Sequence, residues 1–283
     1  MTRARGEQGY ALVAAVASIV VFAAMALAIL STTRAAIATG AAEVGQARAG
    51  AAADAGVAIA LSGLLATDPD RRWHLEAPAH VVDFAGARVS IRVEDERGKV
   101  PLNLLDEEMA TRLLEKFGYD GDALRTARDS LLDWLDGDDN PRPYGAESAF
   151  YAPLGYRPRN GALASVGELR RVRGFDAGVV ARMLPILTVN FGRGNFEPGH
   201  ADPVAIEIVQ GDEGAAEAID RARELAGQRV ALDASNANRE DLTAHPLMIS
   251  VVAQYPDGSR AERRQVIELT GSALRPYVVR SYD

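Results

Sequence analysis

The dominant hydrophobic pattern of the chain is an uninterrupted apolar run close to its start. Tyr10–Leu30 carries no charge, and Ser18 is its one clearly polar side chain. As an α-helix rising about 1.5 Å per residue, the run would extend roughly 30 Å, enough to cross the hydrocarbon core of a bilayer. The basic stretch Met1–Arg5 precedes it, so we expect the N-terminus to stay cytoplasmic and the body to be exported.

The apolar run is longer than the core of a cleaved secretory signal, which has about 7–15 apolar residues before a small-residue cleavage site. A cut could be placed near Ala35 or Ala38, but Thr32–Arg34 leads straight into more helix-compatible sequence. Residues 31–66 are Ala-rich with scattered polar positions, and are predicted to prolong the helix as an amphipathic element. Its glycines each weaken the helix by about 1 kcal/mol and favour a bend, and Asp68–Asp70 is expected to end it.

Beyond this helix the pattern predicts two groups of strands. Alternating and β-branched residues predict a hairpin of His80–Phe84 and Ala87–Glu94. Near the C-terminus, Met248–Gln254 and Glu262–Leu269 flank a turn that contains Pro and Asp-Gly where turn chemistry favours them. Tyr277–Arg280 is a candidate for a last strand.

The residues between the strand groups have a helical pattern, with Asp95–Lys99 as a polar turn at the entry and Asp106 as a helix cap. A helical block between strand groups indicates an insertion into one α+β domain. The predicted helices are Glu107–Phe117, Asp122–Leu135, Ser165–Val172, Asp176–Leu184 and Glu213–Leu225.

Composition narrows the function classes. The chain has 283 residues, 48% of them hydrophobic, a net charge of -8 and no cysteine. The absence of cysteine excludes disulfides, thiolate zinc sites and thiol catalysis. The acidic balance argues against a nucleic-acid surface, which needs clustered Lys and Arg. No nucleophile-elbow or metalloprotease motif occurs in the sequence, so an enzyme is not expected.

The N-terminus resembles a prepilin-type leader, which is short and basic, ends in Gly and is followed at once by the apolar helix. Here the cut would follow Gly9 and make Tyr10 the new N-terminus, where the family more often has Phe or Met. The resemblance implies that the helix is kept after processing. Most pilin-like proteins carry Glu as the fifth mature residue, which pairs with a neighbouring subunit's N-terminal amine; here that residue is Ala14.

One type II secretion family, the minor pseudopilins called general secretion pathway protein K, lacks this Glu. Leu131–Tyr151, LLDWLDGDDNPRPYGAESAFY, resembles its run of Asp-Trp-Leu-Asp, a second acidic pair and aromatic residues. Asp95–Asn103 resembles the segment that enters the family's helical insertion, and Leu163–Gly174 resembles the helical motif that follows. The resemblance covers the leader, the anchor and most of residues 95–190.

The resemblance implies an α+β fold, in which a long pilin-like N-terminal helix packs on an antiparallel sheet and a large helical domain is inserted between strands. The implied parts are the leader 1–9, the transmembrane and periplasmic helix segments 10–30 and 31–66, the sheet 67–104 and 228–283, and the insertion 105–227. The implied function is capping of the pseudopilus tip, initiation of its assembly and support of protein export across the outer membrane. The implied partners are proteins I and J of the pathway, the major pseudopilin, the inner membrane, and the prepilin peptidase that cleaves and methylates the N-terminus.

An acidic loop is the best candidate for bound metal. Four of its oxygen-bearing side chains fall at positions 1, 3, 5 and 12 of an EF-hand count, and hard oxygens suit calcium. Pro141 stands where an EF-hand needs Gly, so spacing alone also allows a solvated acidic turn. Members of the family that this chain resembles bind calcium in their helical insertion. The resemblance therefore implies a structural calcium ion in the acidic loop. The candidate ligands are Asp136, Asp138, Asp139, Asn140 and Glu147.

Two other functions remain open from the sequence. A singly anchored periplasmic binding protein would use the Ala-rich helix as a stalk outside any filament. A DNA-uptake pseudopilus protein would contact phosphates through the helix pair around Arg173–Phe175, where arginines cluster. The net charge of -8 argues against DNA binding. The arginines in question are Arg170, Arg171, Arg173 and Arg182.

Overall fold

The computed structural model describes residues 5–68, 71–73, 75, 79–192, 194–211, 224 and 242–282. Its packing divides into two units. The first comprises Met1–Gly56, Val81–Ser90 and Val252–Glu262. The second comprises Val57–His80, Ile91–Val251 and Arg263–Asp283.

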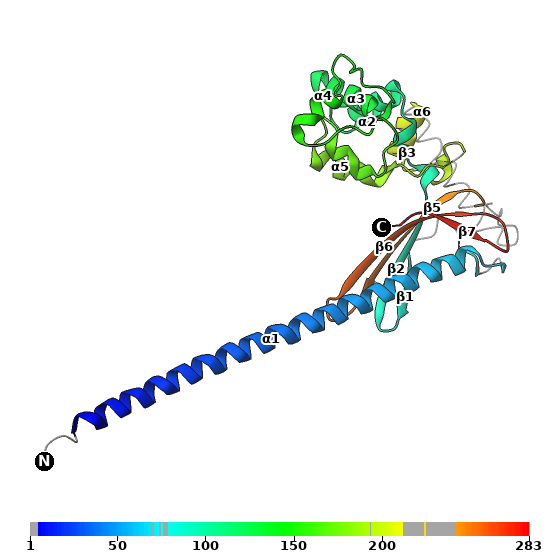
Figure 1. Cartoon of the computed structure of the whole chain (residues 1–283). Helices are drawn as coiled ribbons and strands as arrows, with labels where there is room; N and C mark the ends of the chain where they lie inside the picture. The colour runs from blue at the N-terminus through cyan, green and yellow to red at the C-terminus, as the bar shows by residue number, and fades with distance from the viewer. Residues whose placement is uncertain are drawn as a thin grey trace. The chain divides into compact units, whose positions relative to one another are not determined.

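The first element, α1, is a single helix over Arg5–Leu64 (Figure 1). This confirms that the apolar run and the Ala-rich segment form one element, and the glycines do not interrupt it. The helix ends at Leu64, before the Asp68–Asp70 stop predicted from the sequence.

Within the first unit, the later part of α1 packs against the turn at residues 255–259. Gly45 lies so close to Ser259 that an added Cβ would collide with the serine hydroxyl. The Arg48 guanidinium donates to Asp257 Oδ2 at 2.6 Å and lies 4.2 Å from the centroid of the Tyr255 ring. Glycine and alanine at these helix positions, with Ala49 and Ala53 fully buried, allow this close approach.

The main sheet has five strands in the order β1-β2-β5-β6-β7. The two hairpins agree with the prediction, and β6 pairs antiparallel with β7. β2 and β5 are neighbours in the sheet, although the helical segments lie between them in the sequence. The helical segments are therefore inserted between two adjacent strands. The strands are β1 (His80–Phe84), β2 (Ala87–Asp95), β5 (Pro246–Gln254), β6 (Arg260–Leu269) and β7 (Tyr277–Tyr282).

The helical block belongs to the second unit and has its own core, which includes Trp134, Tyr151 and Met183. A short parallel pair joins β3 (Val100–Pro101), which precedes the first helix of the block, to β4 (Leu187–Thr188), which precedes its last helix. Its helices are α2 (Glu107–Lys116), α3 (Gly121–Leu135), α4 (Ser148–Tyr151), α5 (Ala177–Met183) and α6 (Pro203–Gln210).

Caps explain where these helices begin. Asp106 Oδ1 accepts from the Met109 amide at 2.7 Å, as predicted, and Asp176 does the same for Gly178 at 2.8 Å. Gly174 has a φ of +90°, and a Cβ there would lie 2.9 Å from Ala127 Cα. The glycine in the Arg-Gly-Phe turn therefore serves close packing on α3.

One expectation differs from the structure, a second is refined by it, and one helix was missed. The predicted helix over Ser165–Val172 is a 3₁₀ helix over Val166–Arg171, and the Glu168 carboxylate within it accepts from the Ala164 amide at 3.1 Å. The polar turn at Asp95–Lys99 is a 3₁₀ turn that buries its first two carboxylates. The helix α6 was not predicted, although Asp202 and Pro203 form a cap and first helical position.

Two expectations lie outside what the structure describes. Of the predicted helix over Glu213–Leu225, only Glu224 is described. The proposed domain boundary at 227/228 falls among undescribed residues, so the domain limits stay a prediction.

Candidate functional site

The acidic loop runs from the C-terminus of α3 to the N-terminus of α4. Asp136 is the residue that closes α3, and Glu147 is the residue before α4. The loop thus joins two helix ends over the length of an EF-hand loop. Pro141 replaces the EF-hand glycine, and the chain turns instead through a hydrogen bond from the Gly145 amide to the Arg142 carbonyl at 2.9 Å.

Three of the predicted ligands come together in this loop. One oxygen atom from each of Asp136, Asp138 and Glu147 lies within 4.8 Å of the others. Glu147 is only 3% exposed, and neither of its carboxylate oxygens has a hydrogen-bond partner among the residues that the structure describes. Asp136 Oδ1 is likewise buried without a partner. Unpartnered buried carboxylate oxygens are costly, and hard oxygens at this spacing fit a divalent cation such as calcium.

The electrostatics of Glu147 follow from this crowding. Burial is the largest cause that raises its pKa, to about 7, and repulsion from Asp133, Asp136, Asp139 and Asp138 adds to it. A cation among these groups would reverse the effect, because an opposite charge favours the ionised carboxylate.

The two remaining predicted ligands make other contacts. Asp139 Oδ1 accepts from the Ser148 amide at 3.1 Å, and its hydrogen bonds with Ser148 lower the pKa of Asp139. Asn140 donates to Asp138 Oδ1 from its backbone amide at 2.8 Å and from its side chain at 3.0 Å. These contacts shape the loop and orient Asp138.

Three residues that contribute to the loop were not identified from the sequence, namely Asp133, Arg142 and Asn160. Asp133 has a fully buried carboxylate, which accepts from Arg142 Nη1 at 2.6 Å. Asn160 donates from Nδ2 to the Asp138 carbonyl, and its Oδ1 is buried without a partner. Asn160 has a φ of +48°; the Asn160-Gly161 pair is a turn signal in the sequence, but it does not reveal a contact across 22 residues.

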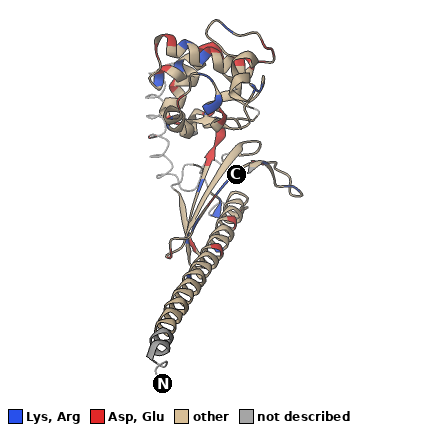
Figure 2. Ribbon diagram, turned by 60° about the vertical axis from the view of Figure 1, so that its left-hand side comes forward, with Lys and Arg blue, Asp and Glu red and all other residues tan. Residues whose placement is uncertain are grey.

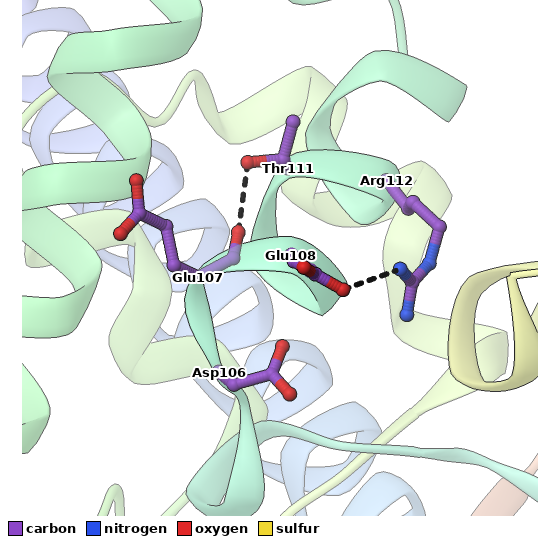
Figure 3. Close-up of a pocket in the computed structure, with 5 residues that line it drawn as sticks. All are labelled: Asp106, Glu107, Glu108, Thr111 and Arg112. Atoms are coloured by element: carbon purple, nitrogen blue, oxygen red, sulfur yellow. Dashed lines mark hydrogen bonds and ion pairs between the residues drawn. The ribbon is translucent and has the colours of Figure 1, made fainter.

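A second acidic feature lies at the N-terminus of α2, where Asp106, Glu107, Glu108, Thr111 and Arg112 line a pocket (Figure 3). Its groups are used locally. Besides the Asp106 cap, Glu107 pairs with Arg128 at 3.0 Å, and Arg112 donates to the Ile208 carbonyl at 2.7 Å. Carboxylates are favourable at a helix N-terminus, so helix capping accounts for this cluster.

The apolar part of α1 is the other candidate site. Figure 2 shows the described N-terminal half of the helix almost without charged residues. Its large side chains are exposed on all sides, as at Phe22 (70%) and Leu27 (68%), and α1 is the one helix among the described residues with the length and composition to cross a membrane. Ala14 is exposed, and its carbonyl accepts from Ser18 at 2.8 Å. Gly9 and Tyr10 lie in the first turns of α1.

Arg173 is the arginine of the helix pair whose side chain packs against the acidic loop and α4. Arg173 donates to the Gly145 carbonyl at 3.0 Å, and its guanidinium lies 4.7 Å from the Phe150 ring centroid. The backbone carbonyl of Arg171 accepts from the Tyr156 hydroxyl at 2.9 Å.

The chain is similar to known proteins over part of its length. Residues 93–191 match the family model described as type II secretion system protein K. These residues, about a third of the chain, are similar to protein K of the type II secretion system. The matched segment runs from the end of β2 through the acidic loop to the residues after β4.

Curated relatives of the chain are named type II secretion system protein K. Type II secretion system protein K of Pseudomonas aeruginosa is 30% identical over 174 residues, which cover 56% of this chain and 49% of that protein. The protein K of Klebsiella pneumoniae is 35% identical over 99 residues, 34% of this chain and 29% of that protein. The chain thus aligns with half or less of the length of the curated relatives it matches.

A solved structure extends the likeness to the fold. A chain of the GspK–GspI–GspJ complex of enterotoxigenic Escherichia coli aligns with 83% of this chain and 95% of its own length. The TM-score is 0.60 at 17% identity. The α+β fold predicted for this family, with a long N-terminal helix and an antiparallel sheet, is therefore confirmed.

Proposed function

We propose that this protein is a minor pseudopilin that is anchored once in the inner membrane and stands at the tip of a type II secretion pseudopilus. The observation that carries the proposal is the continuity of α1, whose exposed apolar half runs without a break into a half that packs within the protein. An apolar helix that is bare on all sides needs lipid or neighbouring subunits to cover it. A helix continuous with the folded body is suited to be kept rather than discarded.

We infer that its partners are the counterparts of the other subunits named in the solved complex, GspI and GspJ. The major pseudopilin and the prepilin peptidase complete the expected set. Its work is non-covalent, in initiating assembly and supporting export across the outer membrane.

The cap position is supported by two features. Ala14 provides no carboxylate for the N-terminal amine of a neighbouring subunit. The helical block is inserted in the sequence between β2 and β5, which are adjacent in the sheet. Its bulk would hinder the stacking of a further subunit.

We further propose that the acidic loop holds a structural calcium ion. Asp136, Asp138 and Glu147 would provide carboxylate oxygens, and Asn160 an amide oxygen. The ion would supply positive charge to crowded carboxylates and fix the loop between α3 and α4. Asp139 and Asn140 would support the loop from outside this group.

The test of the filament role is co-purification and N-terminal processing of the full-length chain. Expressed with its I and J counterparts, the detergent-solubilised protein should co-purify with both and begin at Tyr10. In cells that lack prepilin peptidase it should retain residues 1–9. A mature N-terminus elsewhere than Tyr10, or purification without either partner, would contradict the proposal.

The test of the metal site is a melt of the full-length protein with calcium and with chelator. Calcium should raise the melting temperature of the wild type and leave that of Glu147→Gln unchanged. An unchanged wild-type melt would remove the calcium site without affecting the filament role.

A further inference from the structure

Arg142 divides the oxygens of the acidic loop into two sets. Its Nη1 donates to Asp133 Oδ1 and to Asp136 Oδ2, each at 2.6 Å. Its backbone amide also lies 3.2 Å from Asp133 Oδ2. The other set consists of Asp136 Oδ1 and both oxygens of Glu147, which have no hydrogen-bond partner in the described part of the chain. One side chain thus satisfies one half of the cluster while the other half is left unpartnered.

The buried carboxylate of Asp133 and the close packing of the loop at Gly145 both fix the position of Arg142. The Asp133 carboxylate is fully buried, so a guanidinium is needed there as a counter-charge. A Cβ on Gly145 would overlap this carboxylate, which shows how tightly the loop closes around the pair. A guanidinium stays protonated in proteins, so Arg142, which donates to both Asp133 and Asp136, is a permanent cation inside the cluster.

We propose that Arg142 is a built-in counter-ion that sets the divalent-cation affinity of the acidic loop. This inference rests on the metal site of the proposed function. By occupying Asp133 and one oxygen of Asp136, Arg142 confines a divalent cation to Asp136 Oδ1, Asp138, Glu147 and Asn160. Its own positive charge repels that cation and weakens its binding.

Arg142 can act through its positive charge or through the position of its hydrogen-bond donors. Two variants distinguish these effects. Arg142→Gln removes the charge and keeps a hydrogen-bond donor. Arg142→Lys keeps the charge but loses the planar fork that can bridge two carboxylates. Arg125→Gln is a matched control, because Arg125 pairs with the exposed Asp122 on the same helical block.

The experiment is calorimetric titration of calcium chloride into the full-length protein in detergent, together with melts in chelator. We expect Arg142→Gln to bind calcium about tenfold more tightly than wild type, and Arg142→Lys and Arg125→Gln to stay within about threefold. In chelator, Arg142→Gln should melt about 5 °C or more below wild type, because a buried carboxylate loses its partner.

Unchanged or weaker calcium binding by Arg142→Gln would overturn the inference while leaving the metal site intact. Absence of calcium binding in the wild type would overturn the metal site, and with it the affinity role of Arg142. In that case the melts in chelator would still show whether Arg142 neutralises Asp133.

Discussion

The ring of Trp134 meets the ring of Tyr151 edge to face, with centroids 5.1 Å apart and planes at 89°. Trp134 lies near the end of α3 and Tyr151 ends α4, so this contact joins the two helices that flank the acidic loop. Both side chains are fully buried or nearly so. The polar loop is therefore held by an apolar contact beneath it.

This contact predicts graded losses at Tyr151. Tyr151→Phe keeps the ring but removes the hydroxyl that accepts from the Arg173 amide at 3.1 Å, which should lower the free energy of unfolding by about 1 kcal/mol. Tyr151→Ala also leaves a cavity beside Trp134 and should lower it by about 3–5 kcal/mol. Denaturant unfolding of the full-length protein followed by Trp fluorescence measures both; equal losses would contradict the packing role of the ring.

The raised pKa of Glu147 predicts a pH dependence in the absence of metal. Its folded-state pKa of about 7 exceeds its ordinary value of 4.5, so the folded protein binds the proton more tightly than the unfolded chain does. This contribution is complete below about pH 4.5 and is lost as the pH rises to about 7. In chelator, melts at pH 5 and pH 7.5 should show this loss in wild type, and Glu147→Gln should lack it. A wild type and variant with parallel pH profiles would refute the assignment.

The stabilisation that calcium provides should have the opposite pH dependence. Binding requires ionised carboxylates, so the calcium-induced rise in melting temperature should be larger at pH 7.5 than at pH 5. The matched measurement with magnesium tests selectivity, because magnesium demands a smaller octahedral site. An equal rise at both pH values would indicate binding elsewhere.

The buried group Glu96 predicts a strong effect at Lys99. Glu96 is 2% exposed; it accepts from Lys99 Nζ at 2.7 Å and from the Thr188 hydroxyl. Lys99→Met should lower the free energy of unfolding by about 3–5 kcal/mol, because it leaves a buried charge unpaired. Glu94→Gln alters the half-exposed partner of the same lysine and should cost below about 1 kcal/mol. Similar costs for the two variants would show that burial of Glu96 does not matter.

The absent carboxylate at Ala14 predicts an effect on assembly. A first subunit has no earlier neighbour whose amine could pair with a glutamate there. In Ala14→Glu the carboxylate would face hydrocarbon at a cost of about 2.5–3.5 kcal/mol, so co-purification with the I and J counterparts should fall. Ala14→Ser is the size-matched control and should behave as wild type. Undiminished assembly of Ala14→Glu would argue against the cap position.

Much of the secondary structure could be predicted because local patterns determine it. The cap at Asp106 and the Asp257-Gly258 turn each act within a few residues, and the structure confirms them. The role of Glu168 could not be predicted, because its carboxylate accepts from the Trp134 indole at 3.2 Å. That bond spans 34 residues and has no local signal.

The candidate site shows the same division. The sequence by itself determined the apolar helix, its continuation into the body and the acidic residues of one loop, because periodicity and charge are properties of neighbouring positions. Only the tertiary structure decided which carboxylates lack partners. It buried Glu147, assigned Asp133 and half of Asp136 to Arg142, and brought Asn160 to the loop from 22 residues away. The physical reason is that desolvation and counter-charge depend on what packs around a group.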